Sequence, residues 1–335
     1  MKIHVLPISG GGFVSQLGVY YMLSQVFRCK PDVSIGSSGG NIVAYIGMAA
    51  DWRPERILET AGLINSTLFV QSWTPDFFPT WILFPVTQSV YRSAGGIERF
   101  FKTIFTPVSI RRTEIYTGTF NTSNERNTVF CNRTQSDSLL KYEPNDRSYE
   151  KSILDTDPVV YLEGDLKLIS NAVYASASIP YITQGVVIKG DVHIDGGSMY
   201  ASPLISMTKM IERYFESNPD ELVQMTYFCS YNMETLFGKG IVKSISTLIH
   251  SLVLQDRNLA IVLFEKIIKR KSVYKRYHKV DMSRLKSLFS PLENRHYLAI
   301  LSPHESSEVN VTKFTGNDVK SIVEDTNTCQ VYIWV

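Results

Sequence analysis

The sequence predicts an α/β protein with a mainly parallel central sheet flanked by helices and with a helical C-terminal part. Two short apolar runs, residues 3–8 and 33–35, fit buried strands, and residues 16–27 between them have apolar side chains at helical spacing. A glycine-bracketed serine at 36–40 then separates the second strand from a helical run at 41–50. Strand, helix and strand in this order predict that the first two strands are parallel neighbours.

The length and composition favour one large domain. The chain has 335 residues, of which 44% are hydrophobic, so we expect a single domain over 1–335 with a core at 1–230 and a helical and closing C-terminal part at 231–335. A net charge of +2 is too small to indicate binding to nucleic acid. No signal peptide or membrane-length apolar run is evident, and the four cysteines are widely spaced, as in reduced intracellular proteins. These observations predict a cytoplasmic protein.

Three consecutive glycines, Gly10, Gly11 and Gly12, follow the first strand and precede its helix. Such a loop presents backbone N–H groups, which can hold a phosphate or an oxyanion, or it can be a plain turn. The phosphate interpretation is weak because no Gly-Lys-Ser/Thr follows and Ser15 stands where a dinucleotide fingerprint has its third glycine. The carboxyl ends of neighbouring parallel strands lie side by side, so the loop should lie next to Ser38. This position favours the interpretation of the loop as an oxyanion hole.

Ser38 lies at the centre of Gly36-Ser37-Ser38-Gly39-Gly40, a G-x-S-x-G pattern between a strand and a helix. A serine at so sharp a turn is a typical exposed nucleophile, and glycine at positions 36 and 40 avoids clashes of flanking side chains. An ordinary Gly-Ser turn is the alternative. The pattern therefore predicts Ser38 as a candidate nucleophile, with the positive end of the following helix beside it.

The middle of the chain contributes aromatic side chains and several shorter elements. Residues 58–91 are rich in Phe, Trp and Tyr, which fits either helices packed on the sheet or an apolar cap that meets lipid. Residues 114–121 and 127–133 fit two strands, and 167–178 fits a helix of small residues that ends before Pro180. Residues 186–188 and 192–194 then fit a hairpin that turns at Gly190.

That hairpin ends in Asp195-Gly196-Gly197. An Asp-Gly pair most often marks a turn. A serine nucleophile, however, needs a base to take its proton, and an aspartate in a partly desolvated pocket can serve. The functional interpretation places the carboxylate of Asp195 within hydrogen-bond reach of Ser38.

Four blocks in this order resemble the patatin-like phospholipase family: Gly10-Gly11-Gly12, Gly36-x-Ser38-x-Gly40, Ala175-Ser176-Ala177-Ser178-Ile179-Pro180 and Asp195-Gly196-Gly197. The resemblance covers about residues 3–203. It implies a lipid acyl hydrolase on an α/β fold, with a catalytic Ser–Asp dyad at Ser38 and Asp195 and no catalytic histidine. It also implies an oxyanion loop at Gly10, Gly11 and Gly12, to which we add the amide of Gly39.

The sequence departs from the family pattern at two places. Phe13-Val14-Ser15 stands where the family usually has Arg or Lys followed by Gly, and Ala201-Ser202-Pro203 stands where it often has Asn-x-Pro. These departures bear on the phosphate contact and on the fine geometry of the dyad. They motivate one alternative, a catalytically silent protein of the same fold that binds lipid or a partner.

The C-terminal part offers few further candidates. Helices are expected at 203–215, 240–271 and 316–325, with a strand at 223–229 and a final core strand at 297–301. The basic residues that follow 268 fit a solvated helix end or a patch for anionic head groups.

The histidines leave a second mechanism open. The six histidines include no pair at metal-ligand spacing, so no metal and no cofactor is expected. A Ser–His–Asp esterase remains the alternative mechanism, with His296 or His304 as base, whereas His193 fits a packed neighbour of Asp195. One observation speaks against the triad: in α/β-hydrolases the serine turn normally follows several strands, whereas here it closes the first βαβ unit.

Taken together, these patterns predict a phospholipase A type enzyme that cleaves carboxyl esters of glycerolipids through an acyl-enzyme on Ser38. Its partners would be a glycerophospholipid or another acyl lipid, with peripheral contact to membranes.

Overall fold

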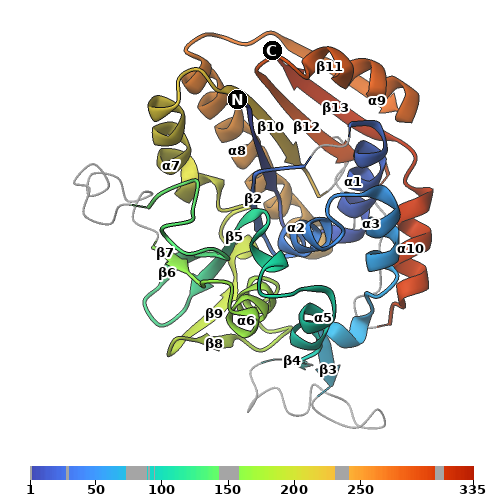
Figure 1. Ribbon diagram of the computed structural model, residues 1–335. Coiled ribbons are helices and arrows are strands. Elements are labelled where there is room, and N and C mark those ends of the chain that lie inside the picture. The colour runs from blue at the N-terminus through green and yellow to red at the C-terminus, as the bar shows by residue number, and fades with distance from the viewer. Residues whose placement is uncertain are drawn as a thin grey trace.

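The computed structural model describes residues 2–27, 30–72, 89, 91–93, 95–142, 158–230, 241–305 and 313–335. Its centre is a mixed sheet in the order β11-β13-β12-β10-β1-β2-β5-β6-β7 (Figure 1). The middle five strands are mutually parallel. The predicted mainly parallel α/β fold is therefore confirmed. These five strands are β12 (Tyr297–Pro303), β10 (Leu222–Phe228), β1 (Lys2–Ile8), β2 (Val33–Ser37) and β5 (Glu114–Asn121).

The N-terminal βαβ unit has the predicted arrangement. Helix α1 (Phe13–Phe27) joins β1 to β2, and Ile8 at the end of β1 is level with Gly36 of β2. Every residue of β2 is buried because helices cover both faces of the sheet, which explains an apolar run without alternation. The glycine loop after β1 and the turn after β2 thus leave the sheet side by side.

Antiparallel strands complete the far side of the sheet: β6 (Arg126–Cys131), β8 (Val186–Ile188) and β9 (Asp191–Asp195), with β7 (Val159–Tyr161) parallel to β6. Strand β9 pairs with residues 119–121 of β5, whose other edge is already occupied by β6. It therefore pairs with the same edge of β5 as β2 does. Strand β2 pairs with this edge as far as Gly118, and β9 pairs with it from Thr119 onward. Because β9 runs antiparallel to β2, the ends of these two strands meet.

Two helical layers cover the sheet, as Figure 1 shows. One apolar cluster joins α1, α2, α3 and α10 to one face, and another joins α7 and α8 to the opposite face. The helices are α2 (Gly39–Ala49), α3 (Pro54–Ala61), α5 (Gly96–Ile104), α6 (Leu166–Ser176), α7 (Leu204–Ser217), α8 (Ile241–Ile268), α9 (Met282–Phe289) and α10 (Gly316–Asp325). A small separate sheet pairs β3 (Val70–Ser72) with β4 (Tyr91–Ser93).

The C-terminal part is less helical than predicted. It contains α8, α9, α10 and the predicted β12, but β11 (Tyr274–Val280) and β13 (Cys329–Trp334) also extend the sheet, so the strand at 297–301 is not the last one. Strand β11 is a mostly exposed edge strand with several basic residues, and such a strand has no apolar run to signal it.

Two predictions bear on contact with membranes. Most of the aromatic stretch predicted as a cap lies at 73–88, outside the described residues. Among the described helices, none is long and apolar enough to cross a membrane.

Candidate active site

Ser38 occupies the sharp turn between β2 and α2 in a strained backbone conformation. Its φ of 52° and ψ of −127° are rare for a residue with a side chain and cost of the order of 1–3 kcal/mol. Two hydrogen bonds hold this conformation: the amide of Ser38 donates to Ser176 Oγ at 2.9 Å, and its carbonyl accepts from the amide of Asn41 at 3.1 Å. The side chain is half-buried and stands at the start of α2.

The glycines of the pentapeptide are required by the close approach of backbone segments. A Cβ atom on Gly36 would lie 3.0 Å from the carbonyl carbon of Gly40, and one on Gly40 would lie 2.5 Å from the carbonyl oxygen of Ile8. A Cβ atom on Gly39 would lie 2.1 Å from the carbonyl oxygen of Gly11. The turn therefore packs directly on the glycine loop, and only glycine fits these three positions without a shift of the backbone.

The carboxylate of Asp195 ends β9 and forms a hydrogen bond with the side chain of Ser38. It also accepts the amide of Gly197 at 2.6 Å. Asp195 is only 6% exposed, and this burial raises the pKa of its carboxyl group to about 7, although both hydrogen bonds act in the opposite direction. A Cβ atom on Gly196 would lie 2.6 Å from the carbonyl carbon of Gly118, so the turn after Asp195 packs tightly on β5.

The glycine loop lies against Ser38 but offers fewer free amides than the sequence suggests. A Cβ atom on Gly10 would lie 3.2 Å from that of Ser38, and Gly11 has a φ of 100° that favours glycine. The amide of Gly10 donates to the carbonyl of Ala201 at 2.6 Å and is thus already used. The amides of Gly11, Gly12 and Gly39 donate to no acceptor among the described residues.

Ser176 at the end of α6 is a site residue to which the sequence analysis assigned no role. Its hydroxyl accepts from the amide of Ser38 and from Asn41 Nδ2 at 2.8 Å, and it donates to the carbonyl of Gly118 at 2.6 Å. One side chain thereby ties the serine turn to α6 and β5. The only signal in the sequence was a small polar residue within the Ala175–Pro180 block.

A second buried carboxylate, that of Asp256, supports the segment that holds the glycine loop. Asp256 of α8 accepts the hydroxyl of Ser202 at 2.6 Å and that of Tyr227 at 2.9 Å, and burial raises its pKa to about 7. Ser202 follows Ala201, whose carbonyl binds the amide of Gly10. Helix α8 is thus connected to the glycine loop through the segment that departs from the family pattern.

The histidines lie apart from Ser38. His193 is buried, with its ring against Phe130 and its Nδ1 3.1 Å from Thr119 Oγ1. His296 Nδ1 accepts a hydrogen bond from the amide of Val223 near the amino end of β10, whereas Ser38 follows the carboxyl end of β2. His304 follows β12, which is three strand spacings or about 14 Å from β2. The groups that shift the pKa of Asp195 are Gly197 and Ser38 and include no histidine.

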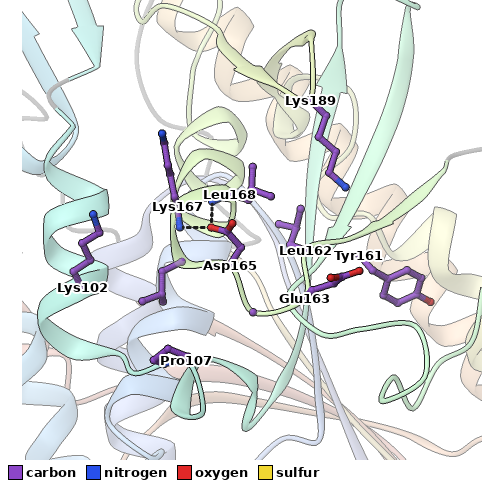
Figure 2. Close-up of a pocket in the computed structure, with 11 residues that line it drawn as sticks. Lys102, Pro107, Tyr161, Leu162, Glu163, Asp165, Lys167, Leu168 and Lys189 are labelled. Carbon is purple, nitrogen blue, oxygen red and sulfur yellow. Dashed lines mark hydrogen bonds between the residues drawn. The ribbon is translucent and has the colours of Figure 1, made fainter.

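A cavity of about 620 Å³ lies away from this site, at the start of α6 (Figure 2). Its walls include Lys102, Lys167 and Lys189, but Asp165 already accepts the first amides of α6, at 2.8 and 3.0 Å. The eleven residues of α6 separate it from Ser176 by about 16 Å. Among the described residues, no group of three or more His, Cys, Asp or Glu side chains is placed to hold a metal ion.

A comparison with models of protein families found a match over more than half of the chain. The family model of the patatin-like phospholipases matches residues 6–207, a stretch that includes the glycine loop, Ser38, Ser176 and Asp195. A comparison with curated proteins found no match. Among solved structures, VipD from Legionella pneumophila is similar at 12% identity and a TM-score of 0.34, over 98% of this chain and 68% of that chain. A likeness at that TM-score carries no argument about this chain.

Proposed function

The chain belongs to the patatin-like phospholipase family, and we propose that it is a lipid acyl hydrolase of the phospholipase A type that uses Ser38 as nucleophile and Asp195 as base. The observation that carries this proposal is the contact between the side chains of Ser38 and Asp195: a Cβ atom on Gly197 would lie 3.4 Å from Ser38 Cβ and 2.9 Å from Asp195 Oδ1, and a hydrogen bond from Ser38 acts to lower the pKa of Asp195. It connects a strained, half-exposed serine to a buried carboxylate. A base with a pKa near 7 suits proton transfer at neutral pH.

In the first half of the reaction, Asp195 takes the proton from Ser38 Oγ while that oxygen attacks the ester carbonyl of the lipid. The carbonyl oxygen becomes an oxyanion, and the unused amides of Gly11, Gly12 and Gly39 are the donors available to it. One such donor typically contributes roughly 2.7–4 kcal/mol to the stability of the transition state. The tetrahedral intermediate collapses when the ester oxygen leaves with the proton that Asp195 returns, which releases the lysolipid.

In the second half, Asp195 takes a proton from a water molecule, which attacks the acyl group on Ser38. Collapse of this intermediate releases the fatty acid, and the proton returns to Ser38 Oγ. A single carboxylate therefore serves as base and acid in both halves. No histidine is required, in agreement with the positions of His193, His296 and His304.

The proposal is tested by product analysis on phospholipid vesicles. Wild-type protein should release one fatty acid and one lysophospholipid per turnover, whereas Ser38→Ala should release neither and remain folded. Ser37→Ala is the matched control, because Ser37 precedes the nucleophile but has its side chain against Gly118 in the sheet. Full turnover by Ser38→Ala would show that the nucleophile lies elsewhere.

A catalytically silent binding protein is the second candidate. One observation favours it: the amide of Gly10 is held by Ala201, so the loop has one donor fewer than three glycines could supply. A folded wild-type protein that binds lipid vesicles and never releases fatty acid from any ester would support this candidate and exclude the hydrolase.

A further inference from the structure

Exposed apolar side chains gather on the two segments that flank Asp195. Among the large hydrophobic residues that remain exposed, Tyr181 is 71% and Met199 47% accessible to solvent. We define the apolar rim as six such residues: Ile179, Tyr181, Ile182, Val187, Val192 and Met199. They come from the segment that precedes the hairpin, from β8 and β9 of the hairpin itself and from the turn that follows β9. They therefore lie at the edge of the sheet where Ser38 and Asp195 meet.

The backbone holds this rim in place. The amide of Asp195 donates to the carbonyl of Ser178 at 3.0 Å, directly before Ile179. The next residues are fixed to β4: Tyr91 donates to the carbonyl of Ile182 at 2.8 Å and accepts the amide of Gln184 at 3.1 Å. Val187 and Val192 form a cross-strand pair on the outer face of the hairpin. The apolar side chains are thus presented to solvent by hydrogen-bonded backbone on both sides.

The rim also lacks charge. Residues 178–188 and 196–208 contain no Asp, Glu, Lys or Arg, and the hairpin has Lys189 and Asp191 at its turn and the buried Asp195 at its end. Insertion of these segments into the interface of a bilayer would therefore dehydrate apolar surface without dehydrating an exposed charge. A surface of this kind suits a lipid layer with zwitterionic head groups.

The basic residues of the C-terminal part do not share this position. They lie at 269–279, along and before β11, which is five strand spacings or about 24 Å from β2. Figure 1 shows β11 at the opposite end of the molecule from β8 and β9. A membrane bound to the basic residues would therefore face away from Ser38.

We infer that the apolar rim is the surface by which this protein docks on a zwitterionic lipid layer, so that its substrate is aggregated lipid and not a dissolved ester. This inference rests on the proposed function, because it places the rim beside a site that cleaves lipid esters. Docking on the rim brings the interface beside Asp195, because Ile179 directly follows Ser178, whose carbonyl binds the amide of Asp195, and Met199 follows Asp195 by four positions.

Flotation with phosphatidylcholine vesicles tests the inference on Ser38→Ala protein, so that binding is measured without turnover. Adding Tyr181→Ser and Ile182→Ser should lower the vesicle partition coefficient by about tenfold or more. This is the scale expected when two apolar side chains that are half-buried in the lipid layer are removed. Val273→Ser is the matched control, because Val273 is 59% exposed but directly precedes β11, at the opposite end of the sheet. It should bind as the parent does. High salt should leave binding unchanged.

Activity of the same rim variant with Ser38 restored gives the second measurement. Turnover of a soluble short-chain ester should stay at the wild-type level, which also shows that the variant is folded, while turnover on vesicles falls. Undiminished vesicle binding by the rim variant, or binding that is lost in high salt, would overturn the inference. Failure of the proposed function has a different signature, since no ester would then be cleaved in either form while vesicle binding is unaffected.

Discussion

Replacement of Asp195 by asparagine should inactivate the protein and at the same time stabilise its fold at neutral and alkaline pH. The carboxyl group is buried, and its pKa in the folded protein is raised from the usual 3.8 to about 7. The folded state therefore holds this proton more tightly than the unfolded chain does. Ionisation of Asp195 thus costs stability, and the cost grows as the pH rises from 3.8 and is complete above 7.

The magnitude follows from the two pKa values. A difference of about three pKa units corresponds to about 4 kcal/mol of unfolding free energy once the group is fully ionised in both states. At about pH 5 the folded carboxyl group is still protonated, and the cost has reached only about 1–2 kcal/mol. Asparagine has the same shape, can accept the amide of Gly197 through its oxygen and never ionises, so it avoids the whole of this cost.

The assay is urea denaturation of wild-type and Asp195→Asn protein at about pH 5 and about pH 8. The variant should gain about 2–3 kcal/mol relative to wild type between these values. Asp256 has a similarly raised pKa, but it is present in both proteins and cancels in the difference. A difference in stability that does not change with pH would refute the assignment of a raised pKa to Asp195. In wild type, kcat/KM should rise through the same pH range as the base ionises.

Three further variants probe the surroundings of the dyad. Ser176→Ala leaves the amide of Ser38 without its acceptor, so kcat should fall by about tenfold or more with little change in KM; an unchanged kcat would contradict its positioning role. Gly39→Ala brings a Cβ atom against the carbonyl of Gly11 and should abolish most activity in a folded protein, as judged by circular dichroism; wild-type rates would exclude these amides as oxyanion donors. His193→Ala should retain turnover within about tenfold, and a loss of a thousandfold or more in a folded protein would point to a histidine base.

The N-terminal half of the site could be predicted because its chemistry lies in short contiguous blocks. A Cβ atom on Gly10 or on a glycine around Ser38 would lie only 2.1–3.2 Å from a neighbouring atom, so these close approaches favour glycine and leave a direct record in the sequence. Parallel pairing of β1 and β2 then follows from chain order. The approach of Asp195 to Ser38 was expected, but its cause was not, because it depends on β9 taking the edge of β5 that β2 leaves.

The supporting contacts could not be predicted because they join residues far apart in the chain. Ser176 reaches the turn at Ser38 across 138 positions, and Asp256 reaches Ser202 across 54. A serine among small residues, or an aspartate in an amphipathic helix, has no local pattern that marks it as buried. The edge strand β11 was missed for a related reason, since its pairing with β13 is fixed only when the chain end folds back.

The most direct test of the central claim is covalent labelling of the nucleophile with a fluorophosphonate, read by peptide mapping. In wild-type protein at about pH 8, where Asp195 is largely ionised, Ser38 should be the labelled residue. Asp195→Asn should label at least a hundredfold more slowly, the lower end of what a catalytic base contributes, although it remains folded and more stable. A label on another serine, or equal rates of labelling in wild type and Asp195→Asn, would contradict the Ser38–Asp195 dyad.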